Sequence, residues 1–365
     1  MSRPIRVGIT HGDYNGIGYE IIVKALGDER ITELCTPVIF GSKTLLTQAR
    51  TQFVPDEFRF TPVATAAAAT DGHINLVDIT DQEPELQPGI PTPESGKAAV
   101  AALDAAIQAL QEGHIDVLVT APICKENAYN DETFPYPGHT EYLEAVSGDE
   151  ARAMMILFND KMRVALLTTH LPVSEIAGAV TQERIIDTVT RLNDTLRRDF
   201  AIDGPRIAVL ALNPHAGDGG LLGREEQEII IPAIEECRRN GILVFGPKAA
   251  DGFFGSGLWR NFDAVIAMYH DQGLIPLKIV AGSEGVNFTA GLPFIRTSPD
   301  HGTAFDIAWK GKADETSMRQ AIYEALDLFR NRAIFARASR SPLRRHYTEK
   351  GADKTVDLSK DTDDN

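Results

Sequence analysis

The chain has 365 residues, of which 43% are hydrophobic and 24% are charged, and its formal net charge is −16. These proportions are typical of a globular protein that buries a sizeable core, and the length suggests about two domains. The negative charge argues against a nucleic-acid partner, because phosphate contacts need clustered Lys and Arg side chains, whereas a small anionic substrate needs only a few local cations.

The chain has three cysteines that lie far apart in the sequence: Cys35, Cys124 and Cys237. They form no Cys-x-x-Cys pair, so they indicate a reducing compartment and no thiolate metal site. The first residues contain no apolar signal core, and no run of about 18 apolar residues occurs in the sequence. We therefore expect a cytoplasmic protein that does not interact with a membrane.

Strand-like runs alternate with helix-like segments along most of the chain. Strands are predicted at residues 5–10, 37–42, 74–79, 116–122, 163–170, 206–215, 242–247 and 263–270. Helices are predicted at 95–113, with Ser95 as the N-cap, and at 181–200 and 224–241, and a short helix or loop is expected at 63–70. The alternation predicts an α/β fold with a largely parallel sheet.

A glycine-bearing turn follows the first predicted strand, in "GITHGDYNGIGYEII" (8–22). Its glycines, Gly12, Gly16 and Gly18, do not fit Gly-x-Gly-x-x-Gly, and no Lys-Ser/Thr pair follows as in a P-loop. The two common nucleotide fingerprints are therefore absent, although the turn still allows the backbone to approach a ligand closely.

His139 and Thr140 open a helical pattern in "PGHTEYLEAV" (137–146). The free amides and the dipole at a helix start favour an anion there. The alternative interpretation is an ordinary Thr cap with Glu141 in the first turn.

Three of the nine histidines close apolar runs: His170, His215 and His270. Ligands of parallel α/β sheets bind outside the carboxyl ends of the strands, and three convergent neutral imidazoles resemble a catalytic metal site. One such histidine alone would be interpreted as an ordinary residue at a strand–loop boundary, but three favour the metal site.

Three polar side chains lie in apolar surroundings further along the chain. Lys278 lies in the strand-like run 274–280, and Asn287 and Arg296 lie in the segment 284–308. A Lys and an Arg together are the usual means of holding phosphate or carboxylate, although each alone would be interpreted as a surface cation.

Together these stretches resemble the 4-hydroxythreonine-4-phosphate dehydrogenase family of vitamin B6 biosynthesis. The matching segments follow the family order between residues 8 and 314: "GDYNGIGYE", "TAPICKE", "PGHTEYL", "LLTTHLPV", "NPHAGDGGLLGREE", "MYHDQGLIPLK" and "VNFTAGLPFIRTSPDHGTAFDIAWKGKAD". The chain is similar, more distantly, to isocitrate and isopropylmalate dehydrogenases, through "GDYNGIGYE" and through "DHGTAFDIAWKGKAD", which is similar to their adenine loop.

The resemblance implies two α/β/α domains with an interdomain active-site cleft, as in isocitrate and isopropylmalate dehydrogenases. Residues 1–135 plus 290–340 would form the cofactor-side domain, 136–289 the metal, substrate and dimerisation domain, and 341–365 a polar tail. It also implies a homodimer with a shared active site, in which NAD is bound without the Rossmann fingerprint.

The resemblance assigns roles to residues one by one. Metal ligands (for Zn, Mn, Co or Mg) would be His170, His215 and His270, contributed by both chains of the dimer, with His270 serving the active site of the neighbouring subunit. Substrate-binding residues would be His139, Thr140, Lys278, Asn287 and Arg296. On the cofactor side lie Gly12, His301, Gly302 and Thr303. For proton transfer or orientation, the candidates near these residues are Lys125 and Asp271.

The implied activity is an NAD(P)-dependent oxidative decarboxylation. A divalent metal would assist the oxidation of 4-phosphohydroxy-L-threonine to a β-keto acid, which loses CO₂ to give 3-amino-2-oxopropyl phosphate for pyridoxal phosphate biosynthesis. One alternative is the same chemistry on erythronate or threonate 4-phosphate. Another is a metal-dependent hydrolase or lyase without NAD, against which the His-Gly-Thr-Ala segment counts.

Four residues depart from the family pattern. Tyr14, Asn15 and Tyr19 stand where Pro, Ala and Pro are usual, and Trp309 replaces a usual Gly. All four fall on the cofactor side, so the choice between NAD and NADP stays open.

Overall fold

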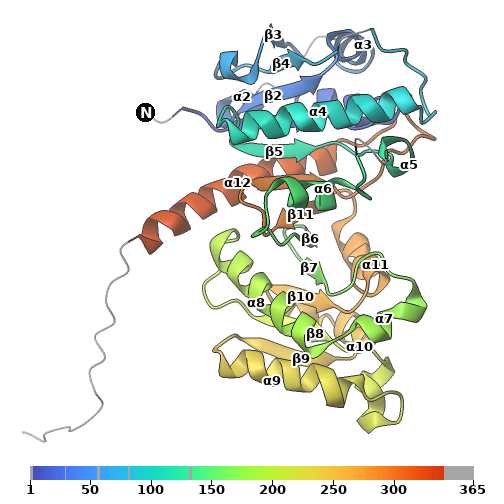
Figure 1. Cartoon of the computed structure of the whole chain (residues 1–365), viewed down its shortest axis with the longest axis vertical. Helices are drawn as coiled ribbons and strands as arrows, with labels where there is room; N and C mark the ends of the chain where they lie inside the picture. The colour runs from blue at the N-terminus through green and yellow to red at the C-terminus, as the bar shows by residue number, and fades with distance from the viewer. Residues whose placement is uncertain (1–2, 29, 56–57, 81–82, 131–133, 341–365) are drawn as a thin grey trace, which may run out of the picture.

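The computed structural model describes residues 3–28, 30–55, 58–80, 83–130 and 134–340. At its centre is a 12-stranded sheet with the order β3-β4-β2-β1-β5-β12-β11-β6-β7-β10-β8-β9, which runs from top to bottom in Figure 1. The strands are β1 Arg6–Thr10, β2 Thr36–Gly41, β3 Thr61–Val63, β4 Asn75–Asp78, β5 Val117–Thr120, β6 Met154–Phe158, β7 Arg163–Leu166, β8 Ile207–Leu210, β9 Val244–Lys248, β10 Ala264–Ala267, β11 Val286–Ala290 and β12 Ile295–Pro299.

The α-helices are α1 Gly18–Ala25, α2 Ile31–Leu34, α3 Lys43–Phe53, α4 Pro93–Gln111, α5 Lys125–Ala128, α6 His139–Val146, α7 Val173–Ala179, α8 Gln182–Arg198, α9 Ile231–Arg239, α10 Ala250–Gly255, α11 His270–Ala281 and α12 Thr316–Ser339. Short 3₁₀ segments are η1 Ala66–Ala68, η2 Pro214–Gly220 and η4 Leu258–Asn261, and η3 Glu226–Ile230 is a π-helix. Within the ranges that the structure describes, none of these helices combines the length and the apolar character needed to span a membrane.

The α/β fold class is confirmed, and all eight predicted strands are present. Most neighbours pair in parallel, but the pairs β12–β11, β11–β6 and β6–β7 are antiparallel. The antiparallel strands join two parallel halves at mid-sheet. The domain boundaries implied by the resemblance stay a prediction, and the polar tail at 341–365 lies outside the described residues.

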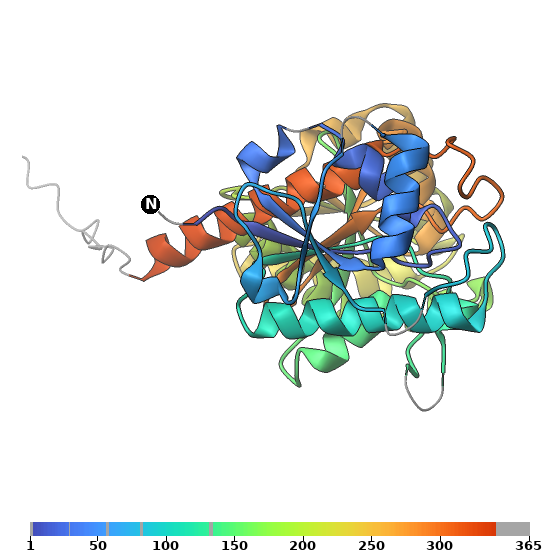
Figure 2. The ribbon, with the colours of Figure 1, turned by 90° about the horizontal axis from the view of Figure 1, so that it is seen from above.

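Side chains of β5 alternate between the two faces of the sheet. Val117 and Val119 belong to the apolar cluster that contains Ile322 of α12, whereas Leu118 belongs to the cluster that contains Leu103 of α4. Figure 2 shows α4 on one face of this half and α1, α3 and α12 on the other. Burial of each such side chain contributes roughly 1.5–3 kcal/mol, so packed layers fix β5 and β12 on both faces.

Two local predictions were wrong. The cap of α4 is Thr92 rather than Ser95, because Pro93 takes the first helical position and Ser95 completes a capping box with Thr92. The run 274–280 is part of the helix α11 rather than a strand. A short, uniformly apolar run has no periodicity that separates strand from helix.

Candidate active site

A cavity of about 240 Å³ lies beyond the carboxyl ends of the parallel neighbours β5 and β12. Its lining also includes residues from the start of α6, from β6 and β11 and from the segment after β12. This is the edge at which parallel α/β sheets bind ligands. The residues that line it are Thr120, Ala121, Pro122, Ile123, Lys125, Gly138, His139, Thr140, Glu141, Met155, His170, Asn287, Arg296, Ser298, Pro299, His301 and Gly302.

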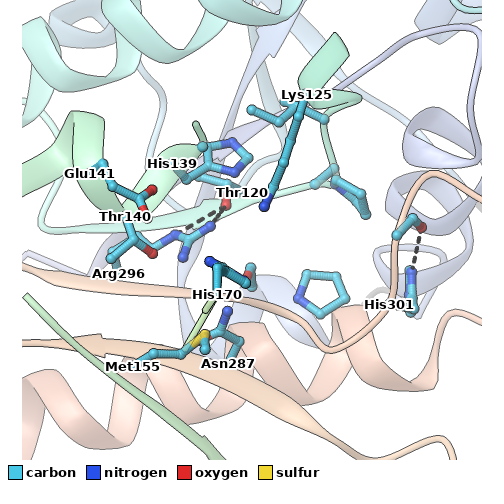
Figure 3. A pocket seen from close by; sticks show the side chains of 17 residues that line it. Thr120, Lys125, His139, Thr140, Glu141, Met155, His170, Asn287, Arg296 and His301 are labelled. Carbon is cyan, nitrogen blue, oxygen red and sulfur yellow. Dashed lines mark hydrogen bonds between the residues drawn. The ribbon is translucent and has the colours of Figure 1, made fainter. Parts of the chain in front are cut away.

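Many of the residues singled out in the sequence meet in this cavity. Four of the five predicted substrate residues line it, and in Figure 3 their side chains lie around one space together with Lys125. We call this group the anion end of the cavity: Lys125, His139, Thr140, Asn287 and Arg296. The fifth, Lys278, is not among the lining residues; its ammonium Nζ lies 3.3 Å from Oδ1 of Asp300.

Arg296 is a cation buried at the anion end, with only 2% of its surface exposed. Its Nε and Nη2 donate to Oγ1 of Thr120 at 3.1 and 2.6 Å, and its Nη1 donates to Oγ1 of Thr289 at 3.0 Å. Burial lowers the pKa of the guanidinium to about 10, a shift that the charge of Glu141 opposes, so the group is still charged at neutral pH.

The neighbouring imidazoles are held in the neutral form. Burial lowers the pKa of His139 well below its usual value, and the charges of Arg296 and Lys125 add to the shift. The pKa of His170 is lowered by burial first and by Lys125 second, against the opposing charge of Glu141. Neutral imidazole is the form that can accept a proton or bind a metal.

The three predicted metal ligands, His170, His215 and His270, make up what we call the histidine end, and of these only His170 is among the residues that line the cavity. None of them closes a strand: β7, β8 and β10 end at Leu166, Leu210 and Ala267. The predicted strands were too long here, because the chain stays apolar beyond the last paired residue of each strand. His270 instead opens α11, and His215 lies in η2.

One chain brings only part of the histidine end together. The rings of His170 and His270 have their centroids 6.3 Å apart. The carboxylate of Asp271 lies 2.7 Å from Nδ1 of His270 and leaves Nε2 of that ring free, as is usual for a metal-binding histidine. Over the described residues, however, no three His, Cys, Asp or Glu side chains come close enough to one another to hold a metal ion.

His215 lies in a left-handed turn that the sequence did not predict. Its φ is 54°, and φ is also positive at Ala216 and Asp218, which costs roughly 1 kcal/mol or more per non-glycine residue. The buried carboxylate of Glu226 holds the base of the turn by accepting the backbone N–H groups of Leu212 and Asn213 at 2.9 and 2.8 Å.

Comparison with known proteins supplies a family. The family described as pyridoxal phosphate biosynthetic protein PdxA matches residues 33–325. The chain belongs to this family. The resemblance stated from the sequence is thereby confirmed.

PdxA relatives cover most of the chain. A 4-hydroxythreonine-4-phosphate dehydrogenase from Bacteroides thetaiotaomicron is 52% identical over 349 residues, 96% of this chain and 95% of the relative. A putative D-threonate 4-phosphate dehydrogenase from Oceanobacillus iheyensis is 40% identical over 332 residues, 90% of this chain and 99% of the relative. The crystal structure of the 4-hydroxythreonine-4-phosphate dehydrogenase from Klebsiella pneumoniae aligns with a TM-score of 0.78 at 37% identity, covering 89% of this chain and 98% of that one.

The residues that the PdxA resemblance places on the cofactor side lie next to one another. Gly12 has φ +67°, and a Cβ there would lie 2.2 Å from the carbonyl oxygen of Pro122, so only glycine fits. The carbonyl of Thr303 accepts the N–H of Ile17 at 3.1 Å, which joins the segment around residues 301–303 to the turn after β1. From the same segment, His301 and Gly302 line the cavity.

The four departures from the PdxA pattern are neighbours in the fold. Trp309 donates from Nε1 to the carbonyl of Tyr14 at 2.9 Å, and its ring lies 6.3 Å from that of Tyr19. Asn15 accepts the N–H of Gln87 at 2.8 Å and donates to nearby groups. The large side chains therefore brace the turn after β1 against the segment that contains Trp309.

Sequence reasoning missed three residues that shape the site. Thr120, Thr289 and Glu226 each hold a functional segment through hydrogen bonds. Threonine is common in strands and Glu at a helix start, so their types carry no signal. Only the placement of Thr120 and Thr289 on the strands beside Arg296 could have indicated them.

Proposed function

We propose that this chain catalyses the NAD-dependent, divalent-metal-dependent oxidation of 4-phosphohydroxy-L-threonine, with decarboxylation to 3-amino-2-oxopropyl phosphate. The observation that carries the proposal is the cavity itself, in which the buried cation Arg296 faces the same space as neutral imidazoles. Membership of the PdxA family and relatives named 4-hydroxythreonine-4-phosphate dehydrogenase support the substrate.

The anion end binds and orients the substrate. Arg296 and Lys278 supply positive charge for its phosphate or carboxylate, Lys278 from outside the lining residues and beside Asp300. His139, Thr140 and Asn287 supply hydrogen bonds that fix its orientation. The Oδ1 of Asn287 is buried without a hydrogen-bond partner among the described residues, so it is free to accept one from a ligand.

Oxidation removes a hydride from the substrate carbon and a proton from its hydroxyl, and loss of CO₂ then leaves a carbanion that takes up a proton. When bound, the dinucleotide accepts the hydride and the divalent metal stabilises negative charge on the substrate oxygen. Lys125 lines the cavity and serves as the proton relay in this proposal. Asp271 orients the imidazole of His270.

We propose His170, His215 and His270 as the metal ligands, divided between the two chains of a homodimer. The donor set suits the metal, because neutral imidazoles bind Zn, Mn and Co well. Division between chains is supported by the incomplete histidine end of one chain and by the exposed apolar residues Ile275 and Ile279 on α11, the helix that begins with His270. Sedimentation equilibrium tests the dimer, and a monomer at micromolar concentration would contradict it.

We propose residues 1–135 with 290–340 as the cofactor-side domain and 136–289 as the second domain. The change from parallel to antiparallel pairing between β12 and β11 supports a boundary near residue 290. Limited proteolysis with mass spectrometry tests it, and cuts confined to other positions would contradict it. The three free cysteines support a cytoplasmic location.

A second candidate substrate fits the same chemistry. The 40% identical relative from O. iheyensis is named a putative D-threonate 4-phosphate dehydrogenase. D-threonate 4-phosphate carries a hydroxyl group where 4-phosphohydroxy-L-threonine carries its amino group. The test is NADH or NADPH formation, followed by absorbance, with a panel of four-carbon acid phosphates, with and without a chelator, and elemental analysis of the purified protein.

We expect the highest kcat/KM with 4-phosphohydroxy-L-threonine and NAD⁺, and loss of activity with the chelator that added metal restores. A higher kcat/KM with D-threonate 4-phosphate would reassign the substrate. Absence of dinucleotide reduction with every substrate would overturn the proposed function.

A further inference from the structure

Arg296 has an unusual set of partners for a buried guanidinium. Its three hydrogen bonds all go to threonine hydroxyls, two to Thr120 and one to Thr289. In the part of the chain that the structure describes, no Asp or Glu lies within ion-pair distance of it. Glu141 lines the same cavity and acts on the guanidinium only from beyond that distance. A buried charge without a direct counter-ion is costly, so this arrangement calls for an explanation.

Another arginine of the same chain shows the usual solution. Arg332 of α12 donates from Nε and Nη2 to the two oxygens of Asp199, at 2.8 and 3.0 Å, and the carboxylate neutralises its charge. Asp199 is fully buried, and Arg198 binds it as well. In this pair a carboxylate neutralises the arginine directly, unlike the hydroxyl groups around Arg296.

Hydroxyl groups fix a guanidinium without neutralising it. Threonine oxygen accepts hydrogen bonds but carries no net charge, and the β-branched side chain has few rotamers. Thr120 lies on β5 and Thr289 on β11, the strands on either side of β12, so the guanidinium is held from both neighbours in the sheet. Three of the five N–H groups of Arg296 are used in this way, and two remain for a ligand.

We propose that Thr120 and Thr289 are positioning residues that hold Arg296 through neutral hydroxyls and so keep its charge for the anionic group of the substrate. The proposal rests on the proposed function only for the identity of that substrate. The anion site is formed by one chain alone and needs neither metal nor dinucleotide.

The test is titration calorimetry of inorganic phosphate into the full-length protein, free of metal and dinucleotide. Hydrogen bonds to charged groups contribute roughly 1.5–3 kcal/mol, so Thr120→Val, which removes two of them, should weaken phosphate binding by roughly 10-fold or more. Thr289→Val, which removes one, should have a smaller effect in the same direction. Thr120→Ser keeps the oxygen and should restore an affinity close to that of the wild type.

Thr297→Val is the matched control. Thr297 is buried on β12 next to Arg296, and its hydroxyl donates to the carbonyl of Ala321 at 2.7 Å rather than contacting the guanidinium. This variant should lose stability without losing phosphate affinity. In turnover, Thr120→Val should raise KM for the phosphorylated substrate much more than it lowers kcat.

Unchanged phosphate affinity in Thr120→Val, or equal loss in Thr297→Val, would overturn the proposal. Wild-type protein that binds no phosphate at millimolar concentration would overturn it too. Phosphate binding needs no turnover, so a wrong substrate assignment would not change the phosphate affinities. Failure of this proposal and failure of the proposed function are therefore distinguishable.

Discussion

The anion end and the histidine end differ in how much of their chemistry a single chain assembles. At the anion end, Arg296 is buried and held by two hydroxyl groups from neighbouring strands, and it faces the same space as Lys125 and Asn287. At the histidine end only the rings of His170 and His270 are neighbours, and His215 lies in a separate turn. At the first end, strands β5, β11 and β12 hold the guanidinium and helices α5 and α6 supply Lys125, His139 and Thr140, whereas segments beyond the strand ends carry the second.

This difference separates two requirements of the proposed reaction. Binding of the substrate anion should need one folded chain, and metal binding should need two. The predictions below test that separation, beginning with the largest expected effect.

His215→Ala should abolish metal-dependent turnover while leaving the anion end intact. Loss of one of three imidazole ligands removes several kcal/mol of stabilisation of developing charge, so we expect kcat to fall by roughly 1,000-fold or more. Elemental analysis should show loss of the metal, and phosphate affinity should match that of the wild type. Full activity after chelator treatment would remove His215 from the site.

Measurements at acid pH can compare the two ends only while the protein stays folded. Protonation of His11 sets the lower limit of that pH range. This ring is buried and stacked on Tyr19 with centroids 5.1 Å apart, and burial lowers its pKa to about 4. The unfolded chain takes up the proton near pH 6.5, so stability should fall by about 3 kcal/mol between pH 6.5 and 4 and show no further loss from this group below that.

His11→Phe keeps the stacked ring and removes the titration. Urea unfolding at pH 7 and at pH 4.5 should show a smaller acid-induced loss of unfolding free energy in this variant than in the wild type. An identical loss in both proteins would assign the acid sensitivity to other groups.

Arg296→Met should weaken substrate binding and leave the metal bound, the reverse of the effect expected for His215→Ala. Because the guanidinium supplies charge-assisted hydrogen bonds to the substrate anion, we expect KM to rise roughly 100-fold with the metal content unchanged. Steady-state kinetics and elemental analysis check this. Unchanged KM would remove Arg296 from the anion end.

Trp309→Phe should affect neither end and should act on the cofactor side. The change removes the hydrogen bond from Nε1 to the carbonyl of Tyr14, which contributes about 1 kcal/mol. We expect the KM for the dinucleotide to rise severalfold, while phosphate affinity and metal content stay constant. A change in phosphate affinity or in metal content would show that the cofactor side is coupled to the cavity.

Much of the fold could be predicted from the sequence, because apolar runs bounded by turns mark buried strands. β3, β6, β11 and β12 were missed, and in β11 and β12 polar residues such as Asn287 and Arg296 interrupt the apolar pattern. Those same interruptions indicated the site, because a charged residue in an apolar strand needs a function or a partner.

Other parts of the site could not be predicted, for physical reasons. The turn that contains His215 is held at its base by the buried carboxylate of Glu226, a tertiary contact that leaves no local pattern. The apolar runs that end at His170 and His270 extend beyond the last paired residues of their strands, because burial continues where strand pairing stops. The spacing of the three histidines along the chain therefore says little about their distances in space.

Pairwise mixing of inactive histidine variants tests the central difference between the two ends most directly. His170→Ala, His215→Ala and His270→Ala are purified separately, mixed in pairs under conditions of subunit exchange, and assayed for dinucleotide reduction. If the metal ligands come from both chains, a mixed dimer of two such variants keeps one intact site, and random exchange should restore about a quarter of wild-type activity. Because His170 and His270 are neighbours in one chain, the structure favours His215 rather than His270 as the ligand from the partner. We therefore predict recovery when His215→Ala is mixed with either of the others and no recovery for His170→Ala with His270→Ala. Absence of recovery in all three mixtures, with subunit exchange verified by native mass spectrometry, would contradict the division of the histidine end between two chains.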